Sequence, residues 1–141
     1  MKPTSIHALF SQFAHLLSKY KARELTKLFY RRCLIIDPSG ILALQMHEEL
    51  FPYLDTICLE LKKAQISRLD FELQELAIHP AGLARCCIQW LGYTQQNKLV
   101  LRNDTYYEIV ELEGKVLINL VLDKEPTPIT LESDLGLDTS S

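Results

Sequence analysis

The residues best suited to acid–base chemistry are His47, Glu48 and Glu49, which stand side by side in the sequence. A histidine beside carboxylates can accept and donate protons near neutral pH. The surrounding segment has helical periodicity, however, and consecutive residues of a helix point to different faces. We therefore expect these three side chains to lie on the surface rather than to form a catalytic group.

The residues that could form disulfides or bind a metal are Cys33, Cys58, Cys86 and Cys87. They form no CxxC pair and have no metal-ligand spacing with the four histidines. Because each cysteine has apolar neighbours, we expect buried thiols that act as small hydrophobic side chains. The sequence also contains no GxSxG, no HExxH and no phosphate-binding glycine loop. It therefore predicts no enzymatic activity, no metal site and no cofactor.

A run of basic residues between positions 19 and 32 is the main candidate for a binding surface. Arg23, Lys27 and Arg31 are spaced four residues apart, so a helix over residues 22–36 would align them in one stripe, which Lys19 extends. Such a stripe can bind the phosphates of a nucleic acid or an acidic partner. The alternative is a solvated helix face opposite an apolar one.

Composition and charge limit the class of protein that carries these residues. The chain has 141 residues, of which 48% are hydrophobic and 23% charged, as in a soluble globular protein with a real core. Its apolar runs are too short to span a bilayer and no signal peptide is apparent, so we expect a cytoplasmic protein. Residues 1–64 hold nine Lys and Arg against six Asp and Glu, whereas residues 65–141 hold six against twelve. The second part is thus acidic, which opposes DNA binding there.

Hydrophobic periodicity predicts mostly α structure with a small antiparallel β-sheet. We expect an N-terminal helical bundle over residues 1–64, and a module over 65–123 that shares its core. The module would contain helices over 67–77 and 83–95 and strands over 98–102, 105–112 and 116–122. Residues 124–141, with two prolines and no basic residue after Lys124, predict a flexible acidic tail.

Across residues 67–122, the spacing of small and apolar residues resembles the winged helix-turn-helix superfamily. The residues that carry this resemblance are Ala77, Gly82, Leu83, Cys87, Leu91, Leu99, Val100, Leu101, Arg102 and Tyr107. The resemblance implies a recognition helix over 83–95 and a wing at Asn103-Asp104. In DNA-binding members that helix reads base edges, a role that Arg85 and Gln89 would take here. The helix start lacks phosphate-binding residues and the wing is acidic, so the resemblance favours a protein-binding member.

The third predicted strand is apolar throughout, which indicates a partner or dimer interface. The candidate interface residues are Val116, Ile118, Leu120 and Leu122. We therefore predict a non-enzymatic winged-helix-like adaptor that acts through protein–protein contacts, as a homodimer and away from membranes. The alternative is a small dimeric nucleic-acid-binding regulator that uses Lys19, the basic stripe, Arg85 and Gln89. An enzyme with unrecognised residues in a pocket is the third hypothesis.

Overall fold

The computed structural model of the chain describes residues 1–123. The predicted acidic tail, residues 124–141, lies outside the described residues. The described residues form α1 (Pro3–Ser18), α2 (Ala22–Leu25), the 3₁₀ helix η1 (Thr26–Leu28), β1 (Phe29–Asp37), β2 (Gly40–Ala43), α3 (His47–Lys63), β3 (Arg68–His79), β4 (Leu83–Tyr93), β5 (Leu99–Leu112) and β6 (Lys115–Leu122). The fold is therefore α+β with a large sheet, and the prediction of a mostly α protein is wrong.

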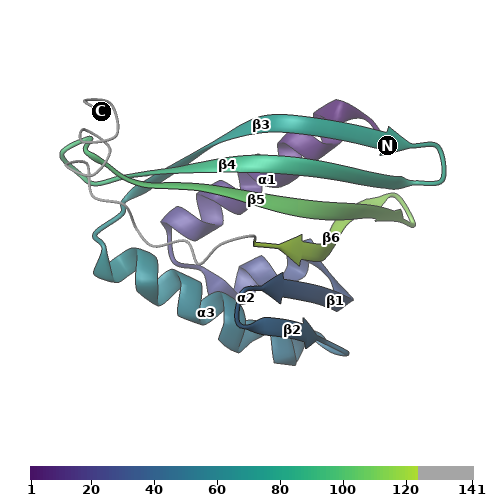
Figure 1. The fold of residues 1–141 in the computed structure, drawn as a ribbon, viewed down its shortest axis with the longest axis horizontal. Helices are drawn as coiled ribbons and strands as arrows, with labels where there is room; N and C mark the ends of the chain where they lie inside the picture. The colour runs from purple at the N-terminus through teal and green to yellow at the C-terminus, as the bar shows by residue number, and fades with distance from the viewer. Residues whose placement is uncertain (124–141) are drawn as a thin grey trace.

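The six strands form one mixed sheet in the order β2-β1-β6-β5-β4-β3 (Figure 1). β1 pairs with β6 in parallel, and every other neighbouring pair is antiparallel. β6 therefore lies inside the sheet, with β1 on one side and β5 on the other. Because β1 and β2 belong to this sheet, residues 1–64 do not form the predicted helical bundle.

The winged-helix prediction is also wrong, because the predicted recognition helix is strand β4. Residues Ala84, Cys86, Ile88 and Trp90 alternate along β4 and are buried on one face. The segment also has apolar residues on its other face, so its pattern fits a helix and a strand equally well. The predicted wing, Asn103-Asp104, lies in the middle of β5, where it pairs with Gln89 and Trp90 of β4.

Most of the predicted helix over 22–36 is not helical either. Only Ala22–Leu25 is α-helical, and after η1 the chain extends into β1. Asp37 is the last residue of β1. Its Oδ1 accepts hydrogen bonds from the backbone N–H of Ser39 (2.8 Å) and of Gly40 (3.2 Å), which closes the β1–β2 hairpin. Gly40 has φ +148°, a conformation that side-chain-bearing residues rarely adopt.

The strongly periodic elements agree with the sequence. Within the segment for which helices are predicted, residues 1–64, α1 is helical. Its inward residues recur every three to four positions and are buried: Ile6, Leu9, Phe10, Phe13, Ala14 and Leu17. The third predicted strand is β6, which follows a tight turn at Glu113-Gly114 where both φ angles are positive. No helix within residues 1–123 is long and apolar enough to cross a membrane.

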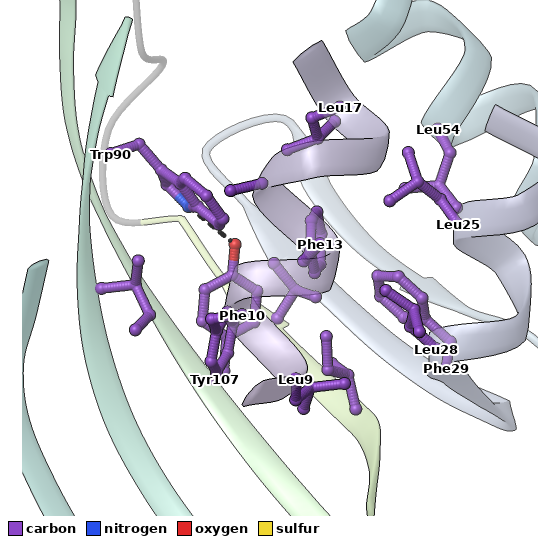
Figure 2. Close-up of a cluster of buried hydrophobic side chains, with 14 of the residues drawn as sticks. Leu9, Phe10, Phe13, Leu17, Leu25, Leu28, Phe29, Leu54, Trp90 and Tyr107 are labelled. Carbon is purple, nitrogen blue, oxygen red and sulfur yellow. Dashed lines mark hydrogen bonds between the residues drawn. The ribbon is translucent and has the colours of Figure 1, made fainter. Parts of the chain in front are cut away.

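The core lies between the helices and one face of the sheet, which we call the inner face. α1 crosses this face behind the long strands β3–β5, while α3 lies near β1 and β2 (Figure 1). Phe10 and Phe13 of α1 contact Trp90 of β4 and Tyr107 of β5, with ring centroids 4.9 to 6.3 Å apart (Figure 2). All four side chains are buried, so α1 is fixed to the middle of the sheet by aromatic packing.

Candidate functional site

A cavity of about 90 Å³ lies between the inner face of the sheet, the C-terminal half of α1 and α3. Fifteen residues line it: Phe13, Leu17, Phe29, Tyr53, Leu54, Ile57, Leu61, Leu69, Trp90, Leu101, Asn103, Thr105, Tyr107, Val121 and Asp123. Most of this lining is aliphatic or aromatic. Ligand sites in proteins commonly have this character, with a few polar groups that fix orientation.

Strand β5 supplies most of the polar lining. Asn103, Thr105 and Tyr107 are two residues apart, so all three side chains point to the inner face. Asp123, the residue after β6, completes the group. The Thr105 hydroxyl donates a hydrogen bond to Asp123 Oδ1 over 2.9 Å. Thr105 is 3% exposed and Asp123 is half-buried, so this bond is partly shielded from solvent.

The parallel pairing of β1 and β6 holds Asp123 in place. The backbone N–H of Asp123 donates to the carbonyl oxygen of Ile36 over 2.8 Å, one register step beyond the Ile36–Leu122 pair. The two strands therefore end together and bring Asp37 close to Asp123. Electrostatic repulsion between them contributes to a raised pKa of Asp123.

Burial shifts the titration of the three acidic groups at this end of the cavity. It raises the pKa of the Asp123 carboxyl, the Thr105 hydrogen bond opposes that shift, and Asp37 adds to it. Burial also raises the pKa of the Tyr53 and Tyr107 phenols, and the negative charge of Asp123 raises both further. Both phenols therefore keep their protons at neutral pH and can serve as hydrogen-bond donors.

Trp90 sets the direction of the Tyr107 hydroxyl. The Trp90 indole N–H donates to the Tyr107 oxygen over 3.0 Å, the dashed line in Figure 2. The phenol oxygen thus accepts one bond, and its own proton can be donated to one acceptor, either Thr105 or a ligand. Thr105 interacts with the same hydroxyl and also donates to Asp123. A chain of polar contacts therefore leads from Trp90 through Tyr107 and Thr105 to Asp123.

This set of groups can accept and donate hydrogen bonds but carries no positive charge. No Lys, Arg or His is among the fifteen lining residues. Within residues 1–123, no group of three His, Cys, Asp or Glu residues could hold a metal ion. Among the described residues, the cavity therefore offers one carboxyl, two phenols, a hydroxyl and an amide inside apolar walls.

The predicted basic stripe is not formed, because its members lie on different elements. Lys19 follows α1, Arg23 is on α2, Lys27 is on η1 and Arg31 is on β1. All four are exposed, and the Arg23 guanidinium lies 4.2 Å from the centre of the Phe51 ring. The i, i+4, i+8 spacing aligns side chains only on a continuous helix, which is absent here.

Arg85 and Gln89 lie on the outer face of β4, opposite the cavity. Arg85 forms an ion pair with Glu108 of β5, with Nε and Oε2 3.1 Å apart. β5 and β6 separate β4 from β1, which carries Arg31. The structure therefore does not combine these side chains with the basic residues of the first half into one surface.

The predicted interface residues of β6 are divided between the two faces of the sheet. Ile118 is fully buried in the core, and the half-buried Val116 packs against that core. Leu120 and Leu122 are half-buried, and they alternate with the inward-facing Val121. The apolar character of β6 thus reflects in part its central position in the sheet.

The sequence interpretation did not identify the cavity residues. The alternation of Asn103, Thr105 and Tyr107 would have indicated them if the segment had been assigned to one continuous strand. Asn103-Asp104 was interpreted as a turn, however, because both residue types favour turns. Asp123 is eighteen residues away in the sequence from Thr105, and only the pairing of β5 with β6 brings the two together.

Comparison with solved structures identifies the fold as the NTF2-like, or cystatin-like, α+β fold. A domain of unknown function with a cystatin-like fold from Nostoc punctiforme aligns with a TM-score of 0.67 and 15% identity, over 99% of this chain and 86% of that one. An NTF-2 like protein of unknown function from Shewanella oneidensis aligns with a TM-score of 0.65 and 10% identity, over 89% of this chain and 100% of that one. These neighbours overturn the winged-helix assignment and, with it, the adaptor and regulator functions that rested on it.

A second protein of unknown function with a cystatin-like fold from Nostoc punctiforme aligns with a TM-score of 0.65 and 14% identity, over 86% of this chain and 88% of that one. No protein-family model matches the sequence. No curated protein matches it either. At these levels of identity the likeness concerns the fold alone, so the function must be argued from the cavity.

Proposed function

We propose that this protein binds a small, mainly apolar organic molecule in the cavity and orients it through one polar group. The observation that carries this proposal is a partly buried carboxyl, Asp123, at one end of an otherwise mostly apolar and aromatic cavity. Asp123 accepts one hydrogen bond, from Thr105, and keeps acceptor positions for a ligand, which would gain affinity and a fixed orientation by donating to them.

The size of the cavity limits the ligand. Its volume of about 90 Å³ is smaller than the roughly 150 Å³ apolar cavity that accommodates benzene. We therefore expect either a molecule smaller than benzene or the end of a larger one. A five-membered ring with one polar substituent has six non-hydrogen atoms, as benzene does, so it probes the upper end of this size range.

Binding can be measured through Trp90, the only tryptophan in the chain, which lines the cavity. We expect small cyclic molecules to shift the indole N–H signal of ¹⁵N-labelled protein. Ile57→Phe, which fills space in the cavity, should weaken binding. Leu59→Phe on the same helix is the matched control, because Leu59 is 55% exposed and does not line the cavity. Equal binding by both variants would place the ligand elsewhere.

A second candidate function is proton-transfer catalysis. This proposal differs from the sequence analysis, which predicts no enzymatic activity. The observation that favours it is the raised pKa of Asp123, which suits a general base better than that of an exposed carboxylate. Tyr53 and Tyr107 could donate hydrogen bonds to an oxygen that becomes negatively charged. The test is exchange of the α-protons of cyclopentanone in deuterium oxide, which Asp123→Asn should abolish without preventing ligand binding.

A further inference from the structure

The charge of the cavity lining is one-sided. Among the described residues that line the cavity, Asp123 is the only carboxylic acid and none is Lys, Arg or His. Asp37, at the end of the neighbouring strand, adds a second negative charge near Asp123. Within residues 1–123, neither carboxylate forms an ion pair with Lys, Arg or His. Among the described side chains none compensates this negative charge, and a positively charged ligand would do so.

The aromatic walls near Asp123 are suited to contact an organic cation. Five aromatic residues line the cavity: Phe13, Phe29, Tyr53, Trp90 and Tyr107. The ring of Phe13 lies 5.4 Å from that of Trp90 and 5.7 Å from that of Phe29, so aromatic surface is continuous along one wall. Aromatic faces attract ammonium groups, and the attraction grows as water is excluded.

We propose that the ligand of this cavity is a small organic ammonium ion, whose N–H groups donate to Asp123 and whose hydrocarbon part packs among the aromatic rings. This inference rests on the proposed function, because it names the ligand class for the same cavity. The Thr105 hydroxyl donates to one carboxylate oxygen and leaves acceptor positions on Asp123 for the ligand. Asn103 and the tyrosine oxygens provide further acceptors near the ammonium.

A neutral alcohol of the same shape is the strongest competing ligand class. It too could donate to Asp123, but it would leave the buried negative charge uncompensated. Both ligands would donate to an ionised acceptor, but only the ammonium adds a Coulomb attraction between opposite charges. We therefore expect about tenfold tighter binding of the ammonium than of the alcohol at neutral pH.

The test compares cyclopentylamine, which is protonated at neutral pH, with the isosteric cyclopentanol. Both are titrated into the full ¹⁵N-labelled chain, with the Trp90 indole signal as the reporter. Asp123→Asn keeps the shape of the side chain and should reduce amine binding to the level of the alcohol. Asp104→Asn is the matched control, because Asp104 is exposed on the outer face of β5. It should leave the tenfold preference unchanged.

The outcomes separate this inference from the proposed function. Alcohol binding that equals or exceeds amine binding would overturn the ammonium assignment and leave a small-molecule cavity. Failure of both ligands to shift the Trp90 signal would overturn both proposals for ligands of this size. If Asp123→Asn does not fold, the unaltered protein gives the same test by acidification. The amine preference should then disappear as Asp123 is protonated, and a preference that persists would contradict the assignment.

Discussion

The two ends of the inner face differ in how completely they are filled. Toward the start of α1, Ile6 and Phe10 belong to the same hydrophobic core as Ile109 and Ile118, and all four side chains are fully buried. Toward the end of α1, beneath α3, the same sheet leaves a cavity that contains Asp123 and other polar groups. We call these regions the packed end and the cavity end.

We interpret this difference as a division of roles, in which the packed end stabilises the fold and the cavity end binds a ligand. Close packing of apolar side chains provides most of the favourable free energy of folding. A cavity gives up part of that packing, and a buried carboxyl gives up more. Such features are usually retained because a site requires them. The following changes test whether the two ends are specialised in this way.

The largest expected effect comes from truncating matched side chains at the two ends. Phe10→Ala removes a fully buried ring from the packed end and should lower the free energy of unfolding by about 3–5 kcal/mol. Ile57→Ala enlarges an existing cavity at a half-buried position, so it should cost clearly less. Urea denaturation of both variants measures the difference. Equal losses would contradict the division between a packed end and a cavity end.

A smaller effect is expected from the hydrogen bond inside the cavity. Thr105→Val keeps the shape of the side chain but leaves Asp123 without its donor, which should cost about 1–3 kcal/mol of stability. It should also raise the pKa of Asp123 further, because the hydrogen bond favours the ionised carboxylate. Thr105→Ser retains the hydroxyl and serves as the control. If Ser and Val have the same effect, packing rather than the hydrogen bond is responsible.

The two neighbouring aspartates should make opposite contributions to the pH dependence of stability. Burial raises the pKa of Asp123, so its stabilising contribution is present below the usual value of about 3.9 and is lost as pH rises through the folded-state pKa. Hydrogen bonds from Ser39 lower the pKa of Asp37, so its contribution is present above the usual value and is lost on acidification.

Unfolding of Asp123→Asn and Asp37→Asn across the acidic range measures these contributions. Relative to the unaltered protein, Asp123→Asn should gain stability as pH rises, whereas Asp37→Asn should lose it. Slopes of the same sign for both variants would show that the environment of Asp123 is not different from that of Asp37.

The smallest effect concerns the rates at which the thiols react. Burial raises the pKa of Cys33 and Cys86 to about 12 and that of Cys58 to about 11. All three should therefore react slowly with Ellman's reagent in the native state, since the thiolate is the reactive form. Cys58, on the helix that covers the cavity, should react first. Faster labelling of Cys86 would indicate that the sheet opens more readily than α3.

The elements that could be predicted from the sequence are those with one unambiguous period. α1 has a single apolar face, and its buried residues Ile6, Phe10 and Phe13 follow helical spacing. β6 is bounded by a turn with Gly114 and is too short and apolar for a surface helix. Local pattern was sufficient in both cases.

The remaining elements depend on tertiary contacts that no local pattern records. β4 has apolar residues on both faces, including Leu91 and Cys87 on the outer one, so its two-residue period is hidden. The site was hidden because its polar residues interrupt the apolar alternation of β5. Asn103 and Thr105 face a cavity rather than solvent, which only the position of α3 reveals.

An NMR titration of the Asp123 carboxyl carbon, with and without cyclopentylamine, tests whether the cavity binds a cation through this residue. We expect a pKa above the usual aspartate value in the free protein, because the group is partly buried at the end of a mostly apolar cavity. It also predicts that this pKa falls when the amine binds, since a nearby cation favours the carboxylate. An ordinary pKa that does not respond to the amine would contradict both the buried carboxyl and its role in binding.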